Sequence, residues 1–240
     1  MHNNEDIKKL KSQNPEFCKA FDSLHNEHTM TLRKISHELG NALTLINSSL
    51  QIIESSHPEV KTFKYWDTTM EDIIYMKNLI SQISQFNNGE TLSLSIVQLH
   101  SILNDVVNSF LVHEDVINKK ISITLNANSD IPDISGDYIK LKQVFINIIK
   151  NAIEACDEND SIIINLEVKT SSINIRISDT GCGLNETQLK NIFNPMVTYK
   201  PGGTGLGLPI SRRIIKAHKG NISASSVVNK GTAFLIEFPL

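Results

Sequence analysis

A stripe of mostly apolar residues, spaced three and four apart, runs through the first quarter of the chain. Its members are Phe21, Leu24, His28, Thr31, Ile35, Leu39, Ala42, Ile46, Leu50 and Ile53. This spacing places them on one face of an α-helix, and such a face is typically buried in a helix bundle or a coiled-coil seam. The stripe therefore predicts one long helix from about Phe17 to Ser55.

A second apolar pattern follows a break near Pro58, because proline disfavours helix in the residue before it. It consists of Phe63, Trp66, Met70, Ile73, Lys77, Ile80 and Ile83, with Lys77 as an interruption. Two amphipathic helices joined by a short turn form a hairpin, and a hairpin alone leaves half of each apolar face exposed. Pairing two hairpins into a four-helix bundle would bury those faces, which predicts a homodimer.

After the polar cluster Asn87-Asn-Gly-Glu90 the pattern changes to alternating strands and helices. We expect a lead-in over residues 1–16, the helical hairpin over residues 17–89 and an α/β domain over residues 90–240, which makes the class α+β. The expected strands are Leu92–Val97, Ile121–Leu125, Ser161–Lys169, Ile173–Ser178, Ile222–Val227 and Thr232–Phe238. The expected helices of this domain are Leu99–Ile117, Ile139–Ala155, Glu186–Ile192 and Thr204–Lys219.

Composition excludes several functions. The formal charge of −3 gives no electrostatic basis for binding nucleic acid. The three cysteines, Cys18, Cys156 and Cys182, are far apart and form no CxxC pair, so neither a disulfide framework nor a zinc site is indicated, and a reducing compartment fits. No apolar run approaches the roughly 18 residues of a membrane span. The sequence predicts a soluble, cytoplasmic chain with no membrane segment.

His37 and Glu38 lie inside the first predicted helix but outside its apolar stripe. A helix turns by about 100° per residue, so His37 lies about 200° from both Ile35 and Leu39 and should face solvent. An exposed imidazole beside a carboxylate can serve as a nucleophile with a proton acceptor next to it. An ordinary solvated surface has the same features, and the two residues alone leave both interpretations open.

Asn147 and Asn151 lie four residues apart in the predicted helix Ile139–Ala155, so their side chains share one face. Amide oxygens are hard ligands that suit Mg²⁺, which usually also binds substrate phosphates. Two asparagines on a solvated helix face would show the same spacing.

Two segments that contain glycine follow. Asp179-Thr-Gly-Cys-Gly183 comes directly after a predicted strand. There a carboxylate can accept a hydrogen bond from the amino group of a base, although a plain β-turn looks similar. Gly202-Gly-Thr-Gly-Leu-Gly207 leads into a helix, whose first amides and dipole favour phosphate. Its spacing is neither that of a Rossmann unit nor that of a Walker loop.

In this order and spacing, the three motifs resemble the ATP-binding fold shared by gyrase, certain heat-shock chaperones, mismatch-repair ATPases and histidine kinases. Asn147 and Asn151 match its N box, Asp179–Gly183 its G1 box and Gly203–Gly207 its G2 box. The segment Ile192–Lys200 resembles the F box and lid of the kinase branch.

The segment Ser36–Thr44 resembles the H box of dimerising sensor histidine kinases, particularly those of nitrogen regulation and sporulation. Two residues depart from the family pattern. Ala42 replaces a frequent proline, so the helix should be less kinked there, and Glu154 stands where many members carry lysine.

The resemblance implies a sensor histidine kinase that binds ATP and Mg²⁺ in an α/β sandwich. Asp179 would bind the adenine, Lys200 would meet the terminal phosphate, and Asn151, supported by Asn147, would be the magnesium ligand. The nucleotide-binding residues that it implies are Asn147, Asn151, Asp179, Gly181, Gly183, Lys200, Gly203, Thr204, Gly205, Leu206 and Gly207.

The resemblance also implies three catalytic residues. His37 would accept the phosphoryl group, Glu38 would accept a hydrogen bond from its other ring nitrogen, and Asn41 would position a water for dephosphorylation of the partner. That partner would be the receiver domain of a response regulator, which takes the phosphoryl group on an aspartate. An anti-sigma-type serine kinase and a non-catalytic scaffold switched by ATP are the alternatives.

Overall fold

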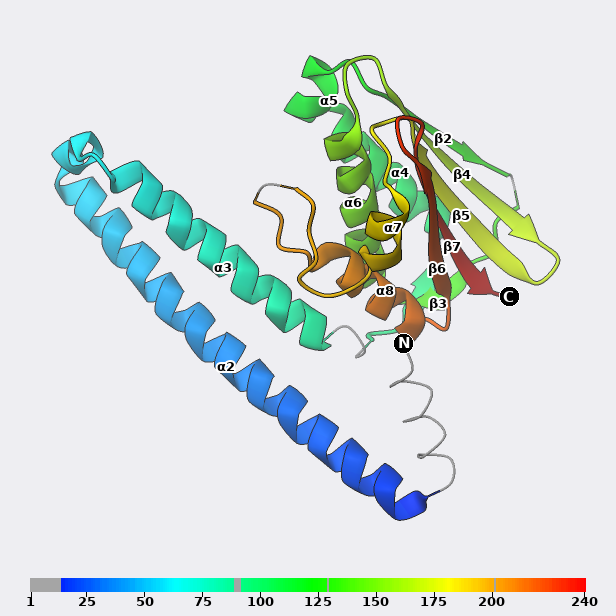
Figure 1. Cartoon of the computed structure of the whole chain (residues 1–240), viewed down its shortest axis with the longest axis horizontal. Helices are drawn as coiled ribbons and strands as arrows, with labels where there is room; N and C mark the ends of the chain where they lie inside the picture. The colour runs from blue at the N-terminus through cyan, green and yellow to red at the C-terminus, as the bar shows by residue number, and fades with distance from the viewer. Residues whose placement is uncertain (1–13, 89–91, 129, 201) are drawn as a thin grey trace. The chain divides into compact units, whose positions relative to one another are not determined.

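The computed structural model describes residues 14–88, 92–128, 130–200 and 202–240. The chain divides into two compact units, Met1–Asn88 and Gly89–Leu240, and each is described by itself (Figure 1). Most of the predicted lead-in, residues 1–13, lies outside the described residues.

The first unit is a hairpin of two helices. Helix α2 spans Pro15–Ser56, a 3₁₀ turn η1 spans Pro58–Thr62, and helix α3 spans Trp66–Asn88. Helix α2 begins where it does because the Asn14 side chain accepts hydrogen bonds from two otherwise unpaired amides of the first turn, at 3.1 Å each. Phe63, predicted to lie on the second apolar face, instead precedes α3 and is 61% exposed.

The side of α2 that faces α3 is not the predicted stripe. Ser36 is buried, and Gly40 lies against α3, where a Cβ atom would be in ordinary contact with the Ile80 side chain at 3.9 Å. These two residues mark the side of α2 that packs on α3, whereas Leu39 and Ile46 of the stripe remain 49% and 48% exposed. The hairpin therefore leaves Leu24, Ile35, Leu39, Ile46 and Ile53 of the stripe exposed, as expected for two helices packed without a second pair.

The second unit is built on a five-stranded sheet of order β2-β4-β5-β7-β6. Its strands are β2 (Ser122–Ala127), β4 (Ser161–Lys169), β5 (Ser172–Asp179), β6 (Asn221–Val227) and β7 (Gly231–Pro239). Strand β2 pairs with β4 in parallel, and the other neighbours are antiparallel. A separate antiparallel pair joins β1 (Ser95–Val97) to β3 (Ile134–Gly136), and β3 was not predicted.

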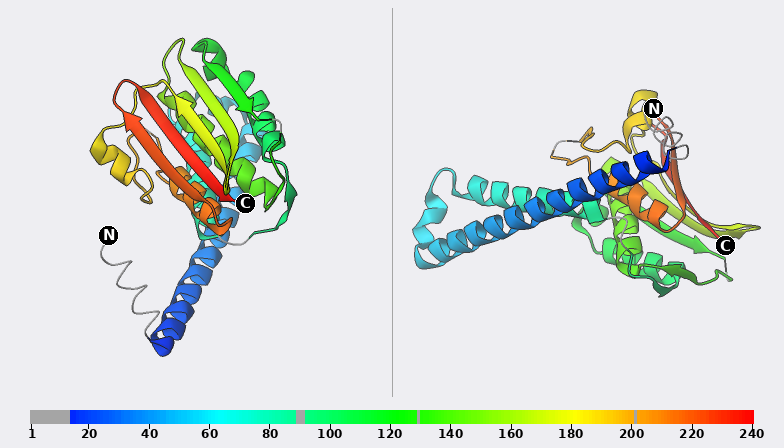
Figure 2. Two further views of the ribbon diagram at one scale, coloured as in Figure 1. Left: turned by 90° about the vertical axis from the view of Figure 1, so that its right-hand side faces the viewer. Right: turned by 90° about the horizontal axis from the view of Figure 1, so that it is seen from below.

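Helices α4, α6 and α8 cover one face of this sheet, and the left view of Figure 2 looks onto the opposite face. The helices of the unit are α4 (Leu99–Leu111), α5 (Glu114–Asn118), α6 (Tyr138–Ala155), α7 (Glu186–Asn191) and α8 (Gly207–Ala217). The single helix predicted over Leu99–Ile117 is therefore two helices, and the one predicted from Thr204 begins three residues later. The predicted α+β class, a helical hairpin followed by an α/β sheet domain, is confirmed.

A buried hydrogen-bond network fixes helix α6 against α8. The Asp137 side chain caps α6 by accepting from the Lys140 amide at 3.1 Å. The Asp137 amide donates to His218 Nε2 at 2.9 Å, and His218 Nδ1 lies 2.8 Å from the Ile214 carbonyl oxygen. Because Nε2 accepts, the ring proton is on Nδ1 and the ring is neutral. Burial lowers the pKa of His218 and so favours this neutral form.

Within the described ranges, no helix combines the length and the apolarity that crossing a lipid bilayer requires.

Candidate nucleotide site and exposed histidine

The predicted N-box and G2-box residues come together between α6 and α8. Asn147 Nδ2 donates to Ser211 Oγ at 3.1 Å, and Ser211 is buried on α8. Gly207, the first residue of α8, lies so close to Asn147 that a Cβ atom would be 2.6 Å from its Oδ1. A larger residue at this position would displace the Asn147 side chain from the start of α8.

Asp179 lies at the end of β5 and is only 7% exposed. Its Oδ1 accepts hydrogen bonds from the Gly181 amide at 3.0 Å and the Thr232 amide at 3.2 Å. Burial raises the pKa of this carboxyl group, and the two amides partly offset that effect. Within the described residues Oδ2 accepts no hydrogen bond. The two amides therefore hold one oxygen of Asp179 in place and leave the other available to a ligand.

The G1 segment lies against the C-terminal end of α6. The Cys182 amide donates to the Ala155 carbonyl oxygen at 3.0 Å, and Gly183 has a positive φ of 64°, a conformation that glycine adopts without strain. Cys156, which ends the helix, is buried, and burial raises the pKa of its thiol to about 12. The thiol therefore stays protonated and is a structural group rather than a nucleophile.

The segment between α7 and α8, described over residues 192–200 and 202–206, carries the predicted lid. Phe193 anchors it, with its ring edge-on to Phe234 at 6.4 Å and beneath the Arg212 guanidinium at 5.5 Å. Leu206 is 2% exposed, so its side chain belongs to the core and only its backbone can meet a ligand. Thr204 Oγ1 accepts from the Leu206 amide at 3.4 Å and steadies the turn into α8.

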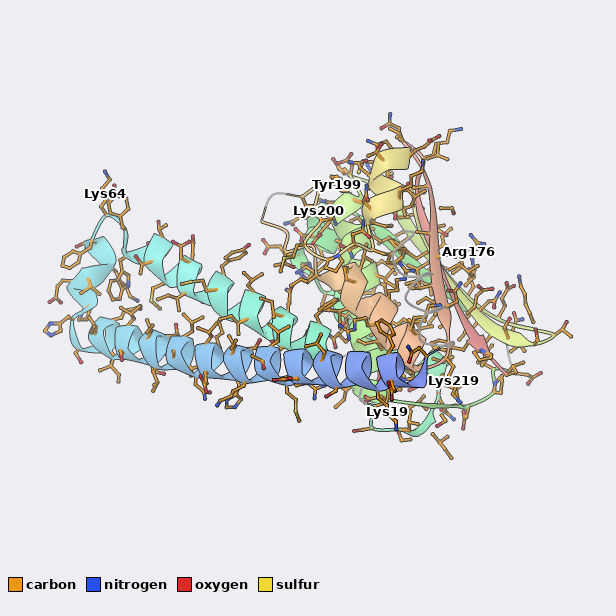
Figure 3. The ribbon with its side chains drawn as sticks, turned by 60° about the horizontal axis from the view of Figure 1, so that its bottom comes forward. Lys19, Lys64, Arg176, Tyr199, Lys200 and Lys219 are labelled. Carbon is orange, nitrogen blue, oxygen red and sulfur yellow. The ribbon has the colours of Figure 1, made fainter. Side chains whose placement is uncertain are left out.

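Lys200 projects from this lid segment onto the end of α6; Figure 3 labels it together with its neighbour Tyr199. Its Nζ donates to Glu154 Oε2 at 2.7 Å, to Asn151 Oδ1 at 3.2 Å and to the Asn151 carbonyl oxygen at 3.4 Å. The predicted magnesium ligand and the predicted phosphate ligand thus touch each other.

The same contacts show that the end of α6 suits a hard cation. Asn151 already directs two oxygen atoms at a positive group, and such oxygens are ligands that Mg²⁺ accepts together with phosphate and water. Among the residues that the structure describes, no group of three or more His, Cys, Asp and Glu side chains could hold a metal.

His37 is exposed on α2, as its position off the stripe predicts. Its Nδ1 lies 3.3 Å from Asn41 Nδ2, one turn along the helix. An amide NH₂ group can only donate, so in this arrangement Nδ1 accepts and the neutral ring carries its proton on Nε2. Asn41, rather than Glu38, therefore contacts the His37 ring in this structure, and the roles of both residues stay predictions.

Three residues of the site were not found from the sequence: Ser211, Thr232 and Gly231. Ser211 holds Asn147, Thr232 holds Asp179, and Gly231, with a φ of 100°, packs on the Asp179 backbone. The only signal was the glycine that opens the last strand. Ser211 acts through a hydroxyl, which is common in helices, and Thr232 acts through a backbone amide, which any residue except proline supplies.

Comparison with known proteins agrees with this geometry. Residues 136–240 match the family model described as the histidine kinase-, DNA gyrase B- and HSP90-like ATPase. Sporulation kinase C of Bacillus subtilis (strain 168) is 35% identical over 207 residues, which are 86% of this chain and 47% of that protein. The signal transduction histidine-protein kinase AtoS of Escherichia coli (strain K12) is 30% identical over 86% of this chain and 34% of its own length. The chain thus spans less than half of either relative.

Solved structures show the same fold. The catalytic domain of the histidine kinase ThkA is 31% identical, with a TM-score of 0.55, over 61% of this chain and 95% of that one. Full-length ShkA, solved in complex with AMPPNP, has a TM-score of 0.76 at 23% identity, over 88% of this chain and 45% of that one. The second likeness extends the agreement in fold to the helical hairpin.

Proposed function

Because the chain belongs to the sensor histidine kinase family, we propose that it transfers the γ-phosphoryl group of ATP to His37 and then to an aspartate of a response regulator. The observation that carries this proposal is a single domain that holds Asn147 against the start of α8 and a buried Asp179 at the end of β5, in a chain whose hairpin exposes His37.

In the proposed complex, Asp179 Oδ2 accepts a hydrogen bond from the adenine amino group, since Oδ1 is already held by two backbone amides. The phosphates lie at the amides of Gly203–Gly207, where the dipole of α8 favours negative charge. Asn151 holds Mg²⁺ and Asn147 supports it. When bound, Mg²⁺ neutralises phosphate charge and so makes the terminal phosphorus easier to attack.

His37 supplies the nucleophile. The lone pair of Nε2 forms the new bond to the γ-phosphorus, the bond from phosphorus to the β,γ-bridging oxygen breaks, and ADP leaves. Attack by Nε2 requires the ring proton on Nδ1, and Glu38 is the proposed acceptor of that hydrogen bond. This contact would replace the one that Asn41 makes with Nδ1 in the present structure.

The hairpin supports the proposed partners. The exposed stripe of α2 is the surface for a second copy, which gives a homodimer with a four-helix bundle. The response regulator would dock around His37, on a different side of the helix. ATP as the phosphoryl donor places the reaction in the cytoplasm.

Incubation with γ-labelled ATP and Mg²⁺ tests the proposal. We expect label on the chain that is lost in acid and stable in base, as phosphohistidine is. His37→Gln should fold, dimerise and bind nucleotide but take no label, because an exposed side chain off the stripe contributes little to stability. Acid-stable label would instead indicate a serine kinase, and nucleotide binding without any label would indicate a scaffold switched by ATP.

A further inference from the structure

The ammonium group of Lys200 occupies the position that a metal ion would need at the end of α6. Its three acceptors come from two residues, Asn151 and Glu154, both in the last two turns of the helix. One of these acceptors, Asn151 Oδ1, is the proposed magnesium ligand. Lys200 and Mg²⁺ therefore compete for one oxygen atom.

Glu154 makes the shortest of the three contacts and supplies the only full negative charge among them. Its Oε2 lies 2.7 Å from Lys200 Nζ, whereas its Oε1 lies 3.9 Å from Lys150 Nζ. The last turn of α6 contains no basic residue of its own, although the C-terminal end of a helix attracts positive charge. Lys200, from the lid, supplies that positive charge.

We propose that Glu154 is a positioning residue that holds Lys200 over Asn151 until nucleotide binds. This inference rests on the proposed function, because it concerns entry of Mg²⁺ and ATP into the same site. In the nucleotide-free chain the Lys200–Glu154 pair fastens the lid to α6. Binding of Mg²⁺ with ATP breaks the pair, and Lys200 then turns to the terminal phosphate.

Lys200 and Mg²⁺ cannot bind the same oxygen atom of Asn151 at the same time. Mg²⁺ binds its oxygen ligands at about 2.1 Å, and a second positive charge at the same oxygen would be repelled strongly. Both groups of the pair are partly exposed, at 41% for Lys200 and 36% for Glu154. An ion pair of this exposure changes an equilibrium by about two- to fivefold. Breaking it should therefore weaken nucleotide binding by about that factor.

Calorimetric titration with AMP-PNP and excess Mg²⁺ measures this cost without phosphoryl transfer. Glu154→Gln keeps the shape of the side chain and removes the ion pair, so it should bind about two to five times more tightly than the wild-type chain. Removing a negative charge near the phosphates would also tighten binding, through simple repulsion. The two causes are separated by repeating the substitution in a Lys200→Met background.

If Glu154 acts by holding Lys200, Glu154→Gln has no effect once Lys200 is methionine. If it acts only by repulsion, the effect is the same in both backgrounds, and the proposal is overturned. Failure of the wild-type chain to bind AMP-PNP at all would instead contradict the proposed function, which this titration tests separately.

A second measurement needs no nucleotide. Tyr199 is 48% exposed and precedes Lys200 in the lid, so chymotrypsin cleavage after Tyr199 reports how often the lid leaves α6. Cleavage after Tyr65 in the hairpin, 65% exposed, is the internal reference. Glu154→Gln should raise the relative rate at Tyr199 by up to about fivefold.

Glu158→Gln is the matched control, because it makes the same change in the Lys120–Glu158 pair, which also has a length of 2.7 Å. The control should leave cleavage after Tyr199 unchanged. An unchanged rate in Glu154→Gln, or an equal rise in the control, would show that Glu154 does not hold the lid.

Discussion

Asp179→Asn should stabilise the second unit while weakening its binding of ATP. The carboxyl group is 7% exposed, and burial raises its pKa above the value in the unfolded chain. The ionised form is therefore less favourable in the folded state. Asparagine removes that charge but keeps an Oδ1 that can accept from the Gly181 and Thr232 amides, so no buried donor loses its partner.

The sign of the pH dependence follows from linkage. A carboxyl group with a raised folded pKa does not destabilise the wild-type chain below its unfolded pKa of about 3.8. Its penalty develops as pH rises from there through the folded pKa. The advantage of Asp179→Asn should therefore grow from acid to neutral pH and then level off. Each unit by which the folded pKa exceeds the unfolded one corresponds to about 1.4 kcal/mol.

The effect on nucleotide has the opposite sign. The side-chain amide that this substitution creates would turn an NH₂ donor toward the amino group of adenine, which is also a donor. Loss of a hydrogen bond to a charged group costs about 1.5–3 kcal/mol, so binding should weaken about ten- to a hundredfold.

Urea unfolding is measured at several pH values from about 4, where the penalty begins to develop, to about 7.5. Far-ultraviolet circular dichroism at fixed chain concentration reports the stability of the sheet domain. The fluorescence of Trp66, the single tryptophan, reports the other unit and should not change. Asp133→Asn makes the same chemical change at an exposed position and is the control. A loss of stability at neutral pH, or a gain equal to that of the control, would refute this reasoning.

Three further predictions concern the rest of the site and the hairpin. Asn151→Ala should abolish labelling that depends on Mg²⁺ but leave the dimer intact in sedimentation experiments, and normal labelling kinetics would show that Asn151 is not the metal ligand. Asn41→Ala should retain labelling of the kinase and lose the acceleration of phospho-regulator decay, measured against wild type and no protein. Residues 17–89 alone should form a dimer at micromolar concentration, and Ile46→Glu should weaken it by about 2 kcal/mol or more, whereas Ser48→Glu on another side of α2 should not.

The elements with strong periodicity were predicted well. Strand β4 has the predicted bounds because Ile162, Ile164 and Leu166 alternate with more exposed residues over its length, and all three side chains are buried. Helix α6 begins one residue before its predicted start, where Asp137 caps it. In both elements the local pattern and the tertiary packing demand the same structure.

The contacts that complete the site could not be predicted because they join residues far apart in the sequence through common chemical groups. Thr232 reaches Asp179 through a backbone amide 53 residues away, so its side-chain type carries no signal. Lys200 and Glu154 are 46 residues apart, and each alone is an ordinary charged surface residue. Strand β3 has three residues, too few to show an alternating pattern.

The apolar stripe of α2 does not mark the side of the helix that packs on α3. At about 100° per residue, the side of α2 that faces α3, marked by Ser36 and Gly40, lies about 90° from the stripe at Leu39 and Ile46. By the same geometry, His37 lies about 80° from the side that faces α3, in the direction away from the stripe. The helix thus has three sides, and the apolar periodicity marks only one of them, because Ser36 and Gly40 on the side that faces α3 are not apolar side chains. This division has a functional consequence. In the proposed function, a second hairpin would cover the stripe without covering the imidazole of His37.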